Sequence, residues 1–328
     1  MTCTQPKESE CEKMTYGLQD FQNVADSPEK EKINSLFNQY KMEMLYLRNF
    51  SERTLRGYQE VFNRWQKYVG EMPTEKNLSR FVIGMREAGL NTTTCNISIR
   101  GFNAFLTWLK DNGHCPQTFA NGKPFRLKKL PEEKKQLRVF DDADIHKILS
   151  FKPKGKNGHR IYALVCTLID TGIRINEALN LEVGRVDFDN LTITVTKGKG
   201  KKERVVPMSL DLRKILHRYV TSHRVSKFDT PFLFSTSTGT HLSHRNAIRD
   251  FENMLGKVGV SKDSIDHCFH SFRRKFARSY IKNGGNIAYL QHAMGHTTLA
   301  MTKHYTGDIP IEDLQMMHQK TSLLGRLK

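Results

Sequence analysis

From residue 36 onward, hydrophobic residues recur every three or four positions, the spacing of one face of an α-helix. Four such stretches follow one another as far as residue 111. Ser51 and Thr74 precede the second and third stretches as candidate N-caps, and Gly89 and Gly113 follow the third and fourth. The pattern predicts a compact bundle of about four helices over residues 31–120.

The second half of the chain mixes two periodicities. Helical spacing is found in residues 141–149, 158–170, 173–179, 209–224, 243–257, 269–283, 286–294, 298–306 and 310–320. Residues 185–207 instead alternate with period two, and LTITVTK and RVVPM lie on either side of the polar KGKGKK, which predicts a β-hairpin with a basic tip. We expect a mainly helical α+β domain with a small sheet over residues 139–308.

Two stretches lack either periodicity. Residues 1–30 hold three lysines against six acidic residues, a net charge of −3, and we predict that they are mostly disordered. Residues 121–138, NGKPFRLKKLPEEKKQLR, contain two prolines and carry a net charge of +5. This composition predicts an unpacked basic linker between the two domains, in which Lys128 and Lys129 are suited to lie along a DNA backbone.

The charge indicates a polyanionic partner. The chain of 328 residues carries +18, so the part after the acidic stretch carries +21. No apolar run is long enough to span a membrane, and the N-terminus lacks the apolar core of a secretory signal. Six cysteines without C-x-x-C spacing are typical of reduced thiols. We therefore expect a cytoplasmic, DNA-associated protein with no membrane partner.

Four segments of the second domain hold residues suited to phosphoryl transfer. TGIRINEAL contains Arg174 and Glu177, and the hairpin KGKGKKERVVP carries Lys199 at its tip. HSFRRKFA places His270 and Arg273 one helical turn apart. In MGHTTLAMTKHYTG, Tyr305 follows His296 by nine residues. Each residue alone has an ordinary interpretation, as surface charge, a helix cap or a packed aromatic.

Taken together, the order and spacing of these segments resemble the tyrosine site-specific recombinases and phage-type integrases. The resemblance is close over residues 139–306, and over the helical domain it extends only to size and position. Carried over position by position, it implies that the catalytic residues are Arg174, Lys199, His270, Arg273, His296 and the nucleophile Tyr305, with Glu177 in a supporting role. No metal or other cofactor is expected.

The residue types suit that chemistry. A tyrosine phenol, with a pKa of about 10, is a weak nucleophile that needs a cationic surrounding or a base. Two guanidiniums, Arg174 and Arg273, can bind the non-bridging oxygens of a phosphodiester and stabilise the charge that develops there. Lys199 is placed to protonate the leaving 5′ oxygen. The resemblance implies a 3′-phosphotyrosyl intermediate and strand exchange through a Holliday junction, without ATP.

The resemblance also implies an architecture and partners. The helical domain would bind the core of the DNA site, and the two domains would form a C-shaped clamp on the duplex. Four copies would act on two DNA sites, with accessory DNA-bending or directionality proteins as further partners. We expect residues 309–328 to dock onto a neighbouring subunit. The remaining candidate DNA-facing residues are Arg53, Arg56, Arg100, Lys201, Lys202 and Arg245.

Other interpretations remain open at this stage. A type IB topoisomerase uses a similar set of residues, although TGIRINEAL and MGH favour the recombinases. A DNA-binding regulator that has lost activity would have no need for Tyr305. An RNA-binding protein is disfavoured because the chain lacks the aromatic strand pattern of RNA-binding sheets. A phage or transposon integrase, a chromosome-dimer resolvase and a DNA invertase all fit the sequence.

Overall fold

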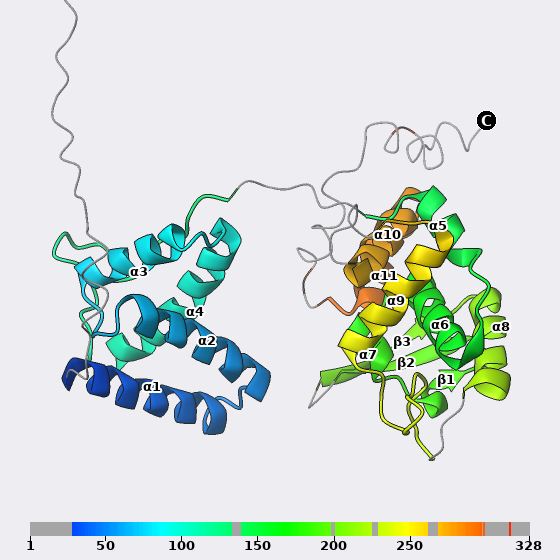
Figure 1. Ribbon diagram of the computed structural model, residues 1–328, viewed down its shortest axis with the longest axis horizontal. Coiled ribbons are helices and arrows are strands. Elements are labelled where there is room, and N and C mark those ends of the chain that lie inside the picture. Colours follow the sequence, from blue (N-terminus) through cyan, green and yellow to red (C-terminus); the bar gives the residue numbers. More distant parts are fainter. Residues whose placement is uncertain are drawn as a thin grey trace, which may run out of the picture. The chain divides into compact units, whose positions relative to one another are not determined.

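The computed structural model describes residues 28–132, 139–197, 201–224, 229–261 and 268–296 together with Thr298 and Gln315, and for Lys197, Lys201, Lys202 and Cys268 it describes the backbone alone. The chain divides into two compact units, Met1–Lys134 and Lys135–Lys328 (Figure 1). The expectations for residues 1–27, Lys199, Tyr305 and residues 309–328 lie outside the described residues, apart from Gln315.

The first unit contains the helices α1 (Pro28–Tyr46), α2 (Glu52–Tyr68), α3 (Glu75–Glu87) and α4 (Thr92–Asp111). The hydroxyls of Ser51 and Thr74 accept backbone N–H bonds at the starts of α2 and α3, as the sequence predicts. The first helix starts at residue 28, within the stretch expected to be disordered. Proline and acidic residues suit its first turn, and Ile33 is fully buried.

Aromatic residues fill the core of the first unit. The rings of Phe37 and Phe62 stack with centroids 3.8 Å apart, which joins α1 to α2. Trp65 stacks on Phe102 of α4 at 4.1 Å, and Phe81 of α3 meets Trp65 edge-on. Large stacked rings bury much apolar area in defined geometries, so they hold the four helices in one arrangement.

The expectation of an unpacked linker over residues 121–138 is wrong for residues 121–132, the part of it that the structure describes. Phe125 and Leu127 are buried in the core of the first unit. The side-chain amide of Asn103 exchanges two hydrogen bonds of 2.9 Å with the backbone of Leu127, and Asn96 does the same with Leu130 at 2.9 and 2.8 Å. Two asparagines on α4 thus satisfy the backbone of this segment, which holds it in place without regular structure.

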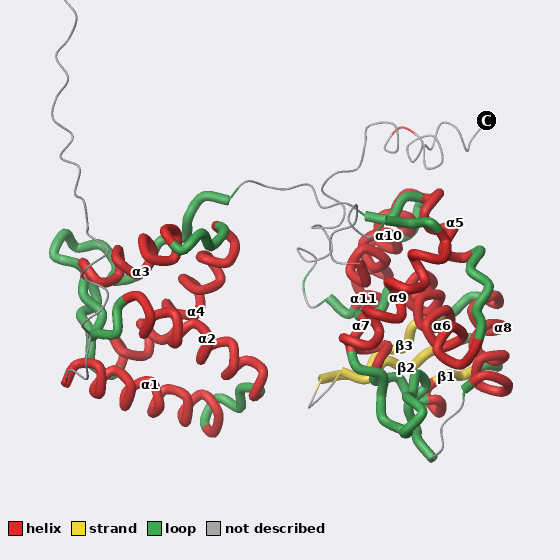
Figure 2. Tube along the Cα trace, in the orientation of Figure 1, coloured by secondary structure: helices red, strands yellow, loops and turns green. Residues whose placement is uncertain are grey.

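The second unit is mainly helical with a three-stranded sheet, as predicted (Figure 2). Its helices are α5 (Asp142–Leu149), α6 (Gly155–Thr171), α7 (Ile175–Leu179), α8 (Leu210–Arg218), α9 (His244–Val258), α10 (Cys268–Lys282) and α11 (Ile287–Met294), with short turns η2 (Val183–Arg185) and η3 (Tyr219–His223). Strands β1 (Val186–Asp187), β2 (Thr192–Lys197) and β3 (Lys201–Pro207) pair antiparallel in the order β1-β2-β3.

Two details of this unit are a buried ion pair and a change of helix type. Arg160 of α6 and Asp250 of α9 form a buried ion pair at 2.9 Å, and Arg160 also donates to the carbonyl of Ser235. The helix expected over 209–224 ends earlier as α8 and continues as a single π-helical turn, η3.

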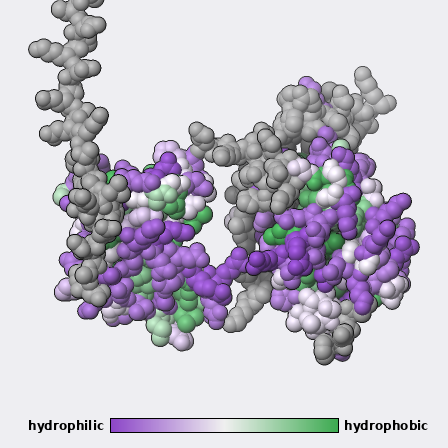
Figure 3. Space-filling model, viewed as in Figure 1, coloured by the Kyte–Doolittle hydropathy of each residue, from purple (hydrophilic) through white to green (hydrophobic). Residues whose placement is uncertain are grey.

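The visible surface of both units is largely hydrophilic (Figure 3). Within the part of the chain that the structure describes, no helix combines the length and apolarity that crossing a membrane requires.

Candidate active site

A tight turn between α6 and α7 places Arg174. The last residue of α6 is followed by Gly172 in the left-handed conformation, with φ +62. A side chain cannot replace it, since an added Cβ would lie 2.2 Å from the ring of Phe276. Two residues later Arg174 is the N-cap of α7, and its side chain is 37% exposed.

Glu177 holds Arg174 in place. One carboxylate oxygen accepts the backbone N–H of Arg174 at 2.9 Å, and the other accepts Nη1 of the Arg174 guanidinium at 3.1 Å. The third residue of α7 therefore caps the helix and orients the side chain that precedes it. This geometry fits the supporting role that the resemblance implies for Glu177.

Arg273 reaches the same place from α10. Its side chain is buried, and it donates to the carbonyl of Gly172 at 2.7 Å and to the carbonyl of Met294 at 2.6 Å. Nη1 of Arg174 donates to the same Met294 carbonyl at 3.3 Å. The two guanidiniums thus meet at the C-terminus of α11, where carbonyl groups without helical partners carry partial negative charge.

His296 completes this group. It follows Gly295, which ends α11 in the left-handed conformation, and its Nε2 lies 2.8 Å from Nη2 of Arg273. Because a guanidinium only donates, Nε2 of His296 is the acceptor, and the ring proton of a neutral His296 is on Nδ1. His270 lies one helical turn before Arg273 on α10 and is exposed.

The sequence interpretation missed one residue of this site, Arg204 of β3. Its side chain is buried and donates to both carboxylate oxygens of Glu177, at 3.0 and 2.7 Å, and to the carbonyl of Ala293 at 2.9 Å. The signal was present in the alternation of β3. Arg204 and Val206 face inward, whereas Glu203 and Val205 are exposed. A charged residue in the inward register of a strand needs a buried partner.

The charges around Glu177 keep it ionised. Burial raises the pKa of this carboxyl group, but the hydrogen bonds from Arg204 and from the Arg174 backbone, together with both positive charges, outweigh burial and lower the pKa to about 2. Glu177 is therefore ionised at neutral pH and lies between two cations.

The structure brings together Arg174, Glu177, Arg273 and His296, with His270 on the same helix as Arg273. The backbone of Lys201 and Lys202 lies at the start of β3, on the hairpin predicted to carry Lys199. The remaining candidates for DNA contact are exposed: Arg53, Arg56, Arg100, Lys128 and Lys129 in the first unit and Arg245 in the second. Arg56 forms a surface ion pair with Glu52 at 3.7 Å.

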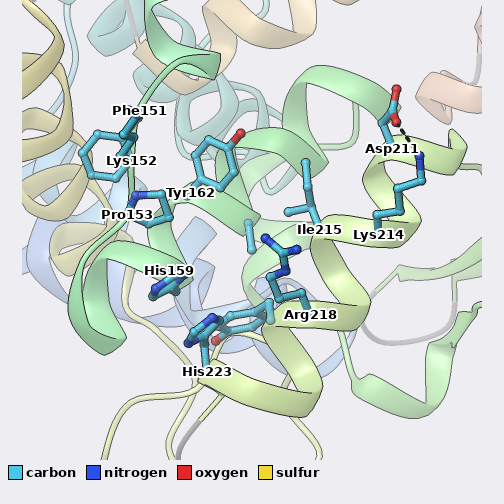
Figure 4. A pocket seen from close by; sticks show the side chains of 12 residues that line it. Phe151, Lys152, Pro153, His159, Tyr162, Asp211, Lys214, Ile215, Arg218 and His223 are labelled. Carbon is cyan, nitrogen blue, oxygen red and sulfur yellow. Dashed lines mark hydrogen bonds and ion pairs between the residues drawn. The ribbon is translucent and has the colours of Figure 1, made fainter.

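A separate hollow of about 530 Å³ contains none of these residues (Figure 4). It lies between the start of α6, α8 and η3, and Lys152, Lys214 and Arg218 surround it. At one end the rings of His159 and His223 stack 3.5 Å apart. Among the residues that the structure describes, no group of three or more His, Cys, Asp or Glu side chains is placed to hold a metal ion.

Residues 138–309 match the model of the phage integrase family, and this span contains every predicted catalytic residue. The chain belongs to the phage integrase family. Among its relatives, tyrosine recombinase XerA of Pyrococcus furiosus is 26% identical over 286 residues, 86% of this chain and 93% of the relative. Tyrosine recombinase XerC of Oceanobacillus iheyensis is 29% identical over 249 residues, 71% of this chain and 76% of the relative.

Solved structures of integrases share the fold. The Tn1549 transposon integrase in complex with a circular intermediate DNA has a TM-score of 0.71 and 20% identity, covering 87% of this chain and 98% of its own. A lambda integrase dimer bound to a core site has a TM-score of 0.65 and 16% identity, covering 83% and 94%. The expected fold class and the expected enzyme, a tyrosine recombinase, are confirmed.

Proposed function

We propose that this integrase-family protein cleaves and rejoins double-stranded DNA with Tyr305 as nucleophile. The observation that carries the proposal is the convergence of Arg174, Arg273 and His296 at the C-terminus of α11, with Tyr305 nine residues beyond His296. The bond that forms joins the phenolic oxygen to the 3′ phosphate, and the 5′ oxygen leaves. Because the phosphotyrosyl ester conserves the bond energy, a 5′-hydroxyl of another strand reverses the step without ATP.

Each candidate residue has a role in this step. Arg174 is held at Nη1 while its side chain remains partly exposed, which leaves it accessible to a non-bridging oxygen. Arg273 supplies further positive charge, and the Nδ1–H of His296 supplies a hydrogen-bond donor for the same phosphate. His270, which is exposed on α10, accepts the phenolic proton in this proposal, and Lys199 protonates the 5′ oxygen.

The substrate and assembly follow from the family. The Tn1549 and lambda integrase structures are described as complexes with DNA. We propose that this protein binds duplex DNA through Arg53, Arg56, Arg100, Lys128, Lys129, Lys201, Lys202 and Arg245, encloses it as a clamp, and acts as a tetramer on two sites in the cytoplasm. We also propose that residues 309–328 dock onto a neighbouring subunit, so that their removal impairs assembly more than DNA binding.

Covalent trapping tests the proposed chemistry. Duplex DNA from the flanks of the protein's own gene, nicked so that the cleaved strand diffuses away, is incubated with the protein in EDTA without ATP. We expect a protein–DNA band on a denaturing gel that is absent for Tyr305→Phe, although this variant binds the DNA equally well. A Tyr305→Phe protein that still becomes attached to DNA would show that the nucleophile is another residue.

Replacement of Arg174 separates catalysis from folding. Arg174→Ala should cleave at least about 10²-fold more slowly, because it removes stabilisation of developing negative charge, while the protein stays folded. Arg273→Ala should in addition lower the melting temperature, since Arg273 is 2% exposed and binds two buried carbonyls. Single-turnover cleavage and thermal unfolding measure both effects. A fully active Arg174→Ala protein would refute the assignment.

A further inference from the structure

Arg204 of β3 is a buried charged residue that contacts two other elements of the candidate active site. It is 5% exposed, and its guanidinium donates to Glu177 of α7 and to Ala293 of α11, two elements other than its own. We propose that Arg204 is a positioning residue for DNA cleavage, which acts through Glu177 to fix the guanidinium of Arg174 against the scissile phosphate. The inference rests on the proposed function.

Arg204 and Arg174 share the carboxylate of Glu177. Each carboxylate oxygen accepts one bond from Arg204 and one from Arg174: Oε1 accepts the two guanidiniums at 3.0 and 3.1 Å, and Oε2 accepts Arg204 at 2.7 Å and the Arg174 backbone at 2.9 Å. The two-pronged pair with Arg204 fixes the plane of the carboxylate. That plane in turn determines where Nη1 of Arg174 lies.

Arg204 also contacts the end of α11. Its Nε donates to the carbonyl of Ala293 at 2.9 Å, and the next carbonyl along, that of Met294, accepts from Arg174 and Arg273. The guanidinium also lies against Gly295, where an added Cβ would be 2.9 Å from Cζ of Arg204. One side chain therefore joins β3 to the start of α7 and to the turn that leads into His296.

The positive charge of Arg204 balances the charge of Glu177. Glu177 is largely buried, and its side chain is 11% exposed. With Arg204 removed, this carboxylate would keep Arg174 as its only ion-pair partner within the described residues, and the attraction would draw Arg174 away from a phosphate. A cation that binds Glu177 from the buried side leaves Arg174 available for the substrate.

Matched variants test the proposal on the full-length protein. Arg204→Met removes the charge and keeps much of the apolar stem, and Arg204→Lys keeps the charge without the two-pronged geometry. The control is Glu203→Gln, the preceding residue of β3, whose exposed side chain pairs with Arg185 at 3.3 Å. The probe is the nicked duplex identified by covalent trapping, and the measured quantities are the single-turnover cleavage rate, the DNA affinity and the melting temperature.

Because small misplacement of a catalytic group costs on the order of 10²-fold in rate, we expect about that loss for Arg204→Met. Arg204→Lys should recover part of it and remain about tenfold slower than the unmodified protein, while Glu203→Gln cleaves normally. DNA affinity should change by no more than a few-fold in all three. If Arg204→Met does not fold, Arg204→Lys carries the same test. A variant that folds and cleaves at the unmodified rate would overturn the proposal.

A second substrate separates this role from an effect on Lys199, which belongs to the same hairpin. Replacing the bridging 5′ oxygen by sulfur gives a thiolate leaving group, which departs without protonation. Lys199→Ala should recover cleavage on this substrate, and Arg204→Met or Arg204→Lys should not, because their defect concerns the non-bridging oxygens. Recovery of the Arg204 variants would overturn the proposal. If the Lys199→Ala protein also failed to recover on this substrate, the result would instead count against Lys199 as the acid in the proposed function.

Discussion

At the residue scale, the site depends on backbone conformations that only glycine adopts easily. Gly172 and Gly295, both left-handed, lie at the ends of α6 and α11, where the chain turns toward Arg174 and His296. Both are also in close contact, Gly172 with Phe276 and Gly295 with Arg204. These two turns bring Arg174 to the carbonyl of Met294 and His296 to the guanidinium of Arg273, which donates to the same carbonyl.

Replacing Gly172 by alanine should destabilise the protein by at least about 1–3 kcal/mol, because φ is +62 and the added Cβ would overlap the ring of Phe276. Gly256 is the matched control. It lies inside α9, an added Cβ there would meet nothing within 4 Å, and Gly256→Ala should stabilise by about 0.5–1 kcal/mol. Chemical denaturation measures both, and equal effects of the two changes would contradict this account.

At the element scale, the helices of the second unit carry ion pairs of very different burial. Arg160 and Asp250, with side chains 9% and 7% exposed, connect α6 to α9. Asp211 and Lys214 form an exposed pair at 3.4 Å within α8. Water and salt screen the second pair and barely reach the first, so the two should respond to mutation by different amounts.

Asp250→Ala should lower the free energy of unfolding by about 3–5 kcal/mol, because it leaves the guanidinium of Arg160 buried and unpaired. Asp211→Ala should change the same quantity by no more than about 1 kcal/mol. Urea unfolding of the two variants at one pH provides the comparison. A small effect of Asp250→Ala would mean that water reaches Arg160.

The stacked histidines at the hollow between α6 and η3 predict a pH effect on stability. Burial, then the neighbouring charges of His223 and Arg218, lower the pKa of His159 below its ordinary value of about 6.5. The folded protein therefore binds this proton less tightly than the unfolded chain does. Stability should be lost as the pH falls through about 6.5, before ordinary carboxylates titrate.

Melting temperatures between about pH 7.5 and 5.5 measure this effect, in a window set by the ordinary histidine pKa. The unmodified protein should lose more on acidification than His159→Gln, whatever the absolute stability of the variant. Parallel curves for the two proteins would show that His159 is not responsible.

At the scale of the whole molecule, a charge of +18 is combined with a candidate phosphate-binding site. The segment that follows α4 is basic and held to the first unit by asparagines, so the exposed Lys128 and Lys129 have defined positions on that unit. We expect these two lysines, on a protein segment with a defined position, to contact DNA phosphates rather than base edges.

Replacing Lys128 and Lys129 together by glutamine should weaken DNA binding to the same extent on specific and unrelated sequences. Each lost phosphate contact should reduce the slope of log affinity against log salt concentration by about 1. Titrations at several salt concentrations measure the slope. A loss confined to the specific sequence would indicate base contacts instead.

The sequence by itself determined the helical periodicity, the caps at Ser51 and Thr74, the alternating hairpin, and the residue types of the site, because these depend on neighbours a few positions away. Only the tertiary structure decided that Arg204 pairs with Glu177, 27 positions distant, and that Arg174 reaches Met294 over 120 positions. It also decided that the basic segment after α4 packs on that helix. Hydrogen bonds between distant segments leave no periodic trace in the chain, and they exist only once packing has brought their partners together.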